Sequence, residues 1–361
     1  MDPAQKQYYP FLDGFRALAI IWVLVHHLNY FFHPAPLFLD PVAGILNRFA
    51  YLGRLGVDIF FVISGFLISG LLFEDLPGKI RIRRFYLRRA FKIVPQYISV
   101  VVVGFILTIL FEPTQPHLLF SMASYLFLFQ NYVQSNGYLA HLWSIAVEEH
   151  FYFLYPLFLQ AIVVLVRSVE RQRRVLLAAF FVMMGLIFFI RRATFVAFPY
   201  NPLMLFQMSH LRFDALLCGC VIKLLEGFLT GPFVARLKLF PLACFLASGG
   251  LFYKVFLHFD ACRSSSYVCV YLASGLLLVS ALCGFGPLLA LTQNRLVRSI
   301  GRHSYGTYIW HYPLMLTVRH LVNRTDWFII LSTFLLSLGA GYLSTVTIEK
   351  YFLNLRKKVV P

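Results

Sequence analysis

The chain has 361 residues, of which 60% are hydrophobic and 13% are charged. Soluble domains carry about 25% charged residues, so this composition excludes an ordinary soluble enzyme. The net charge of +17 does not indicate a nucleic-acid partner, because the basic residues lie in short segments between apolar runs, as in membrane proteins. The six cysteines form no CxxC pair and lie mostly in apolar runs, so we expect neither a metal site nor a disulfide framework.

Ten apolar stretches are predicted to cross the roughly 30 Å hydrocarbon layer of a bilayer. They cover residues 12–32, 50–73, 93–111, 142–166, 175–190, 210–229, 239–257, 267–290, 303–322 and 327–349. A further apolar stretch, 118–132, is short. The sequence therefore predicts an all-α protein, a polytopic transmembrane helix bundle of about ten spans that forms a single membrane domain over residues 1–361.

The basic residues decide the predicted orientation of these spans. If 118–132 does not cross, the loops and C-terminal tail on one side carry 20 Lys and Arg residues, whereas the opposite loops carry 5. Cytoplasmic loops hold the excess of positive charge. We therefore predict that both termini are cytoplasmic and that 118–132 is a re-entrant or interfacial segment.

The first span carries two polar residues on one face. Arg16 and His27 are eleven residues apart, which is about three helical turns and a rise of about 16 Å. Arg16 is then close to the cytoplasmic edge, and His27 lies roughly 8 Å inside the opposite edge. His26 points about 100° away, so only His27 shares the face of Arg16.

Two carboxylates in other spans lie at a similar depth. Asp58 is roughly 12 Å and Glu148 roughly 9 Å inside the same edge. A histidine beside carboxylates in a low-dielectric site is the usual arrangement of a general base. We therefore predict His27, Glu148 and Asp58 as the catalytic set. The alternative is that the three are unrelated polar residues that line a cavity or form structural pairs.

Two spans carry polar stripes at helical spacing. Ser144 lies one turn before Glu148, and Ser304, Tyr308 and His311 follow an i, i+4, i+7 pattern. Such stripes can line a substrate path. They can equally form hydrogen bonds between membrane helices, and the sequence leaves both interpretations open.

The segment KIRIRRFYLRRAFKIVP (79–95) holds seven cations. Arg88, Arg89 and Lys92 can lie on adjacent faces of one short helix. Such a segment can anchor to anionic lipid at the membrane surface. It can also bind a phosphorylated cofactor, because the guanidinium fork suits phosphate oxygens. Coenzyme A, with phosphates at one end and a long arm, would suit a basic cytoplasmic site with a histidine roughly 16 Å deeper.

Six stretches, in this order and spacing, resemble the acyltransferase-3 family of integral membrane O-acyltransferases over nearly the whole chain. They are FLDGFRALAIIWVLVHH (11–27), GVDIFFVISGFLIS (56–69), RRFYLRRAFKIVPQY (83–97), HLWSIAVEEHFYFLYP (141–156), RFDALLCG (212–219) and GRHSYGTYIWHYP (301–313). The resemblance implies transfer of an acyl group, most often acetyl, from cytoplasmic acyl-coenzyme A. It also implies a glycan acceptor, at the cell surface or lipid-linked, such as lipopolysaccharide, and a place in the bacterial inner membrane.

The family motifs can be carried over residue by residue. The matching residues are Arg16 and His27 for the Arg…His motif, Trp143, Ser144 and Glu148 for the Trp-Ser…Glu motif, and Ser304, Tyr305, His311 and Pro313 for the Ser-Tyr…His-x-Pro element. The basic RxxR signature falls on Arg89 and Lys92. The lysine departs from the family pattern, which weakens the case for a bidentate guanidinium at that position.

These assignments give one hypothesis for the reaction. His27 would act as general base on the acceptor hydroxyl, supported by Glu148 or Asp58, and an acetyl-histidine intermediate is the alternative mechanism. The expected donor-binding residues are Arg16, Arg88, Arg89 and Lys92, and the expected substrate-path residues are Trp143, Ser144, Ser304, Tyr308 and His311. The expected partners are the lipid bilayer and the glycan acceptor, with no metal.

Other classes of function remain open at this point. Buried charges in membrane spans are also typical of a transporter or flippase for a glycan or lipid intermediate. An acyltransferase acting on a small secondary metabolite and a non-catalytic scaffold are further alternatives. Because the chain stops soon after the last predicted span, the resemblance implies a stand-alone membrane domain without an appended extracytoplasmic domain.

Overall fold

The computed structural model describes residues 8–32, 41–76, 78–114, 117–133, 137–198, 206–259, 263–322 and 326–359. All the secondary structure in these residues is helical, so the predicted all-α class is confirmed. Cys262 lies outside the described residues, and the other five cysteines are free thiols.

The long helices of the described chain fall on the ten predicted spans. They are α1 (Pro10–Phe32), α3 (Gly56–Phe73), α4 (Ile82–Phe111), α6 (Trp143–Leu165), α7 (Val169–Ala197), α9 (Phe213–Leu229), α11 (Phe240–His258), α12 (Arg263–Leu282), α15 (Ser304–Leu321) and α16 (Trp327–Ser344). The bounds of two helices differ clearly from those of the predicted spans. The predicted span 175–190 is the middle of the 29-residue α7, and the predicted span 267–290 runs beyond the end of α12.

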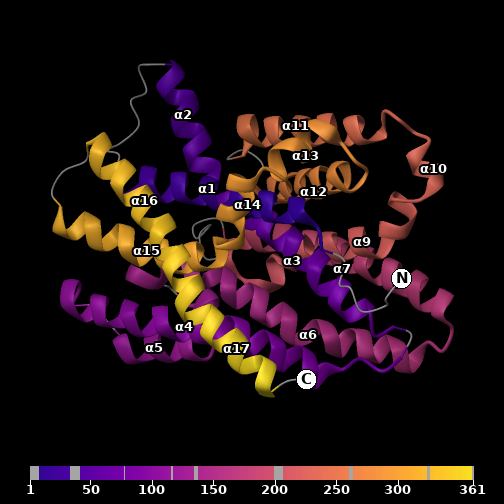
Figure 1. The fold of residues 1–361 in the computed structure, drawn as a ribbon, viewed down its shortest axis with the longest axis horizontal. Coiled ribbons are helices and arrows are strands. Elements are labelled where there is room, and N and C mark those ends of the chain that lie inside the picture. Colours follow the sequence, from indigo (N-terminus) through magenta and orange to yellow (C-terminus); the bar gives the residue numbers. More distant parts are fainter. Residues whose placement is uncertain are drawn as a thin grey trace.

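Short helices connect and extend these long ones. They are α2 (Pro41–Leu52), α5 (Leu118–Leu126), α10 (Pro232–Ala235), α13 (Gly286–Thr292), α14 (Arg295–Arg302), α17 (Lys350–Val359), and the single turns η1 (Gly53–Leu55), η2 (Gln130–Tyr132), η3 (Gly137–Leu142) and η4 (Ser209–Leu211). A π-helical segment, η5 (Thr345–Glu349), joins α16 to α17. These three elements form one continuous helical rod that crosses the front of the molecule in Figure 1.

Seven helical segments of the described chain are long and apolar enough to cross a membrane. They are Pro10–Phe32, Gly44–Phe73, Ile82–Phe111, Val169–Ala197, Phe240–His258, Ser265–Leu282 and Trp327–Val359. Helices α6, α9 and α15 are not among them, because α9 has only 17 residues and the other two carry many polar side chains. The span count of about ten, and the cytoplasmic placement of both termini, therefore stay predictions.

The short apolar stretch 118–132 does not form one continuous helix. Its helix, α5, has nine residues and a length of about 14 Å. A helix of that length cannot cross a hydrocarbon layer of about 30 Å. The structure therefore favours the interpretation of this stretch as re-entrant or interfacial.

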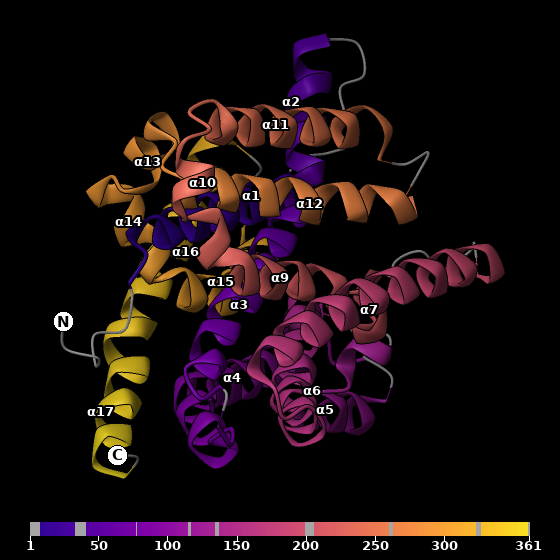
Figure 2. The same cartoon turned by 90° about the vertical axis from the view of Figure 1, so that its right-hand side faces the viewer.

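Helices α1 and α3 lie in the middle of the molecule, between a group containing α11, α12 and α13 and a group containing α4, α5 and α6 (Figures 1 and 2). Helix α1 packs against α3, α14 and α15, and α3 packs most extensively against α9. Glycines allow the backbones of α3 and α9 to approach closely where the two helices cross. A Cβ on Gly65 would lie 1.8 Å from the Leu216 carbonyl oxygen, and a Cβ on Gly219 would lie 2.0 Å from that of Val62.

The molecule is apolar outside and partly polar inside. Large apolar side chains are exposed along α7 and α16, for example Phe189 at 69% and Leu331 at 58%. Charged side chains such as Arg191 and Asp214, at 1% each, are buried. This arrangement fits helices whose outer faces contact lipid, because ionisable groups in membranes face the bundle interior.

Candidate functional site

A cavity of about 120 Å³ lies between α1, α3, α4, α6, α14, α15 and η5. Eight of the residues singled out in the sequence line it, namely Arg16, Arg89, Lys92, Ser144, Glu148, Ser304, Tyr305 and Tyr308. They come from four helices that are distant in the sequence. The tertiary structure therefore gathers most of the predicted donor-binding residues and half of the predicted acidic pair into one place.

Glu148 is held by hydroxyl groups inside this cavity. Ser64 on α3 donates to its Oε1 at 2.9 Å, and Tyr152, one turn later on α6, donates to its Oε2 at 3.1 Å. The guanidinium of Arg89 lies over the Tyr152 ring, 3.9 Å from its centroid. Two hydroxyl donors and the neighbouring Arg89 guanidinium therefore hold the Glu148 carboxyl group in one orientation inside a basic cavity.

Further cations surround the same cavity. Arg16 contacts Asp13, one turn earlier on α1, at 3.4 Å. Lys92 lies on α4, and Arg302 comes from the end of α14. The last helical rod contributes Glu349, whose carboxylate accepts a bond from Gln96 at 3.0 Å.

A second cavity of about 210 Å³ adjoins the first and shares Arg89 and Lys92 with it. Its other basic residues are Arg81, Arg84, Arg88 and Arg356, and its acidic ones are Glu74 and Asp75. Asp75 pairs with Arg81 at 2.5 Å, which raises the pKa of that guanidinium above its ordinary value. The basic segment thus forms a strongly positive cavity that leads to the first one.

Hydroxyl groups line the first cavity on the side that faces the histidines. Tyr308 donates to the His141 carbonyl oxygen at 2.8 Å. Its phenolic proton is therefore committed, so the Ser144 hydroxyl, 2.6 Å away, donates to the Tyr308 oxygen. This pair links α6 to α15 on that side of the cavity.

Four histidines lie beyond this side of the cavity. The ring of His311 is 5.5 Å from that of Tyr308, and the His27 ring is 5.0 Å from His311. His27 Nδ1 and His311 Nε2 are 3.0 Å apart. His141 lies 5.2 Å from His311, ring to ring, and His26 hydrogen-bonds the Ala50 carbonyl oxygen at 3.2 Å. His27 therefore contacts His311, and His311 contacts Tyr308, which lines the cavity.

The structure corrects the expected neighbours of His27. Glu148 is occupied by Ser64 and Tyr152, and Asp58 forms an ion pair with Arg212 at 2.6 Å. Among the described residues, neither carboxylate contacts the His27 ring. Similar depth along separate helices did not bring these groups together, because the helices turn them in different directions.

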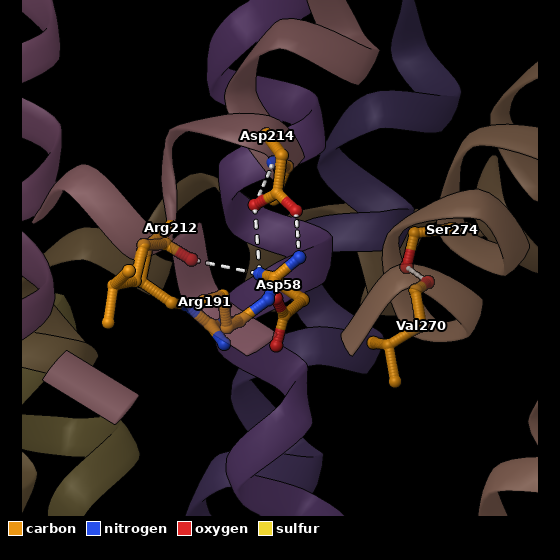
Figure 3. Close-up of polar contacts among 8 residues, drawn as sticks. Asp58, Arg191, Arg212, Asp214, Val270 and Ser274 are labelled. Carbon is orange, nitrogen blue, oxygen red and sulfur yellow. Dashed lines mark hydrogen bonds and ion pairs between the residues drawn. The ribbon is translucent and has the colours of Figure 1, made fainter. Parts of the chain in front are cut away.

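Asp58 belongs to a buried network of two acids and two bases (Figure 3). Arg191 on α7 pairs with Asp214 on α9 and donates to the Leu211 carbonyl oxygen at 2.8 Å. The exposed fraction of Asp58, Arg191, Arg212 and Asp214 is 1% each. A neutral, fully buried network of this kind connects α3, α7 and α9, so Asp58 has a structural environment and lies outside the cavity.

Trp143 is also directed away from the cavity. Its ring lies 4.7 Å from that of Phe206, and the Arg212 guanidinium is 5.8 Å from its centroid. The same guanidinium is 4.4 Å from the Tyr267 ring centroid. Trp143 is therefore part of an aromatic enclosure around Arg212 and does not line the predicted substrate path.

Comparison with protein families decides the class of the chain. The model of an acyltransferase domain, that of the acyltransferase-3 family, matches residues 9–348. The chain belongs to the acyltransferase-3 family. The match includes both cavities except for Glu349 and Arg356, which lie beyond the matched residues.

Named relatives of this acyltransferase-3 chain are similar over most of its length. It is 28% identical to the peptidoglycan O-acetyltransferase OatA of Listeria monocytogenes over 97% of the chain and 57% of the relative. It is 28% identical to the putative peptidoglycan O-acetyltransferase YrhL of Bacillus subtilis over 90% of the chain and 52% of the relative. It is 27% identical to the O-acetyltransferase OatA of Staphylococcus aureus over 86% of the chain and 51% of the relative. The chain thus spans about half the length of these relatives. No solved structure matches it.

Several residues of this acyltransferase site were not found from the sequence. Ser64 and Tyr152 hold Glu148, and a signal for Tyr152 was available, since it lies one turn after Glu148. His141 lies two residues before Trp143 of the Trp-Ser motif. Glu349 is the only acid in the last predicted span. Arg356 carried no signal, because a basic residue in a C-terminal tail is usually solvated.

Proposed function

We propose that this chain is a membrane O-acyltransferase that moves an acyl group, most simply acetyl, from cytoplasmic acyl-coenzyme A to a hydroxyl group of a cell-wall glycan. Membership of the acyltransferase-3 family supports the acyl transfer. The printed names of the relatives favour peptidoglycan, or a lipid-linked precursor of it, over lipopolysaccharide. A bacterial plasma membrane is the location that this function requires.

The observation that carries the proposal is the pair of adjoining cavities that share Arg89 and Lys92. The second cavity offers several arginines to the phosphates of the donor, and guanidinium groups bind phosphate oxygens well. The first cavity continues from there past Glu148 to Tyr308 and offers a path for the arm of the coenzyme. A charged head and a long arm are the two features of coenzyme A that this shape would recognise.

The chemistry requires one base near the end of that path. In the proposed step His27 takes the proton of the acceptor hydroxyl while its oxygen attacks the thioester carbonyl carbon. The carbon–sulfur bond then breaks, and the coenzyme A thiolate leaves and takes up that proton. The products are an O-acyl ester and the free thiol. The reacting groups would meet at His27, so the donor must reach past the Ser144–Tyr308 pair.

The covalent alternative uses the same residue. An acetyl group carried by His27 would form and break on a ring nitrogen before the glycan hydroxyl attacks it. The chain spans about half the length of its relatives, and the prediction that the membrane domain works alone stays a proposal.

A purified preparation in lipid nanodiscs tests the function. We expect acetyl-coenzyme A to release free thiol, at a rate that rises when a soluble peptidoglycan fragment is added, and the fragment to gain the mass of an acetyl group. Thiol release measured by a colorimetric reagent and mass spectrometry of the fragment are the readouts. Movement of a glycan across the membrane without thiol release would instead support the transporter alternative.

A further inference from the structure

His27 and His311 face each other through one nitrogen each. His27 Nδ1 and His311 Nε2 are 3.0 Å apart, and the rings come from α1 and α15. Two nitrogens at that distance form a hydrogen bond only when one carries a proton and the other has a free lone pair. The position of that proton decides which nitrogen of His27 is left for chemistry.

The backbone of α15 decides the protonation of His311. Its Nδ1 is 2.6 Å from the Tyr308 carbonyl oxygen and 3.2 Å from that of Thr307. A carbonyl oxygen only accepts, so His311 Nδ1 must carry the proton. In a neutral imidazole the other nitrogen is then an acceptor. His311 Nε2 therefore presents its lone pair to His27.

The acceptor on His311 in turn decides which nitrogen of His27 carries the proton. Its Nδ1 must donate to His311 Nε2, and its Nε2 is left without a proton. The Val23 carbonyl, one turn earlier on α1, also hydrogen-bonds the His27 ring. The ring nitrogen nearer the backbone is Nδ1, so this second acceptor also fits a proton on Nδ1.

We propose that His311 is a positioning residue that holds His27 in the Nδ1–H tautomer and so leaves Nε2 as the atom that takes the acceptor proton. This inference rests on the proposed function, in which His27 is the base. The bond from His27 Nδ1 to His311 is also present when Nε2 has taken a proton, because Nδ1 keeps its hydrogen in both states. The pair therefore need not rearrange during turnover.

The orienting group in this site is an imidazole. The described rings that pack against His27 belong to His26, His311 and Tyr312, at 4.9, 5.0 and 5.0 Å. Tyr308, whose carbonyl oxygen fixes His311, also lines the cavity. One turn of α15 thus both lines the cavity and sets the tautomer of His27.

Two variants of His311 separate positioning from packing. In His311→Gln the side-chain oxygen can still accept from His27 Nδ1, whereas His311→Phe fills the space without an acceptor. We expect His311→Phe to lower kcat by about 10²–10⁴-fold, the range for loss of general-base catalysis, with the KM for acetyl-coenzyme A within about twofold. His311→Gln should retain at least about a tenth of kcat. His320→Phe and His320→Gln, on the exposed outer end of α15, are matched controls that should behave like the parent.

Nitrogen-15 NMR of histidine-labelled protein reads the tautomer directly, and the His27→Gln spectrum identifies the His27 signals. We expect a protonated Nδ1 and a bare Nε2 on His27 in the parent protein. A protonated Nε2, or equal losses of kcat in folded His311→Phe and His311→Gln, would overturn the inference. If His311→Phe does not fold, the spectrum of the parent protein alone decides. Full activity in His27→Ala would remove the proposed base and leave the measured tautomer as a separate result.

Discussion

The two adjacent histidines of α1 differ in their surroundings although they are neighbours in the sequence. His26 hydrogen-bonds a backbone carbonyl of α2 at 3.2 Å, which is a structural contact. His27 meets His311, close to the cavity. Their difference in direction follows from the 100° step of a helix, and this part of the site could be predicted from spacing alone.

We predict that His27→Ala abolishes glycan acetylation, whereas His26→Ala has a mild effect. Loss of a general base costs about 10²–10⁴-fold in rate, and loss of one neutral hydrogen bond costs about 1 kcal/mol of stability. Acetylation of the glycan in cells is measured together with the amount of protein in the membrane. A His27→Ala protein that accumulates normally and still acetylates would contradict the catalytic assignment.

Asp58 was expected beside His27 because of its depth, but it forms an ion pair with Arg212. We predict that Asp58→Asn lowers thermal stability strongly, because breaking a buried ion pair and leaving Arg212 unpaired costs about 3–5 kcal/mol. Unfolding in detergent, followed by size-exclusion chromatography after heating, measures this. Glu170→Gln, on an exposed residue of α7, is the control. An Asp58→Asn protein as stable as the parent but inactive would return Asp58 to the catalytic set.

At the scale of elements, α4 and α17 together line the second cavity, which the proposed function assigns to the donor. They lie side by side at the lower end of the molecule in Figure 2 and pack against each other. Arg88 comes from the basic segment on α4, and Arg356 comes from a helix beyond the matched family region. The continuous rod α16–η5–α17 brings this tail residue back to the basic segment.

We predict that Arg356→Ala raises the KM for acetyl-coenzyme A by roughly two- to fivefold, since a partly exposed charge contact contributes about 0.2–1 kcal/mol. The double change Arg88→Ala with Arg89→Ala should raise it further, because charge-assisted bonds contribute about 1.5–3 kcal/mol each before solvent screening. Lys357→Ala, on an exposed neighbour, should leave the KM unchanged. If the KM stays constant and only binding to anionic vesicles weakens, the segment anchors lipid.

At the scale of the whole molecule, the side on which the basic cavity opens decides the source of the donor. We predict that residues 79–92, at the start of α4, and residues 167–174, at the start of α7, both lie on the cytoplasmic side, because of the 20-to-5 asymmetry of basic residues. Single cysteines at positions 79 and 170, in a background without other cysteines, are treated with a membrane-impermeant reagent. Labelling of position 170 from outside the cell would mean that 118–132 crosses.

The sequence alone determined the helices and the chemical types present in the site. Burial of an apolar segment in a bilayer depends on local composition and length, and these are written in consecutive residues. The same-face spacing of Arg16 and His27 is likewise local. The family motifs then named Glu148, Ser144 and Ser304, and helical spacing named Tyr308. The structure places these residues around one cavity.

Only the tertiary structure decided which polar groups meet. Counting along a helix gives the depth of a side chain, but the rotation and crossing of that helix decide its direction, and these depend on contacts such as Gly65 against Leu216. Asp58 therefore met Arg212 and not His27, and His27 met His311. Arg356 joined the basic cavity because a long rod brings the C-terminal tail back to α4. The two residues of each pair lie on separate helices, so the spacing of residues along one helix could not reveal which residues meet.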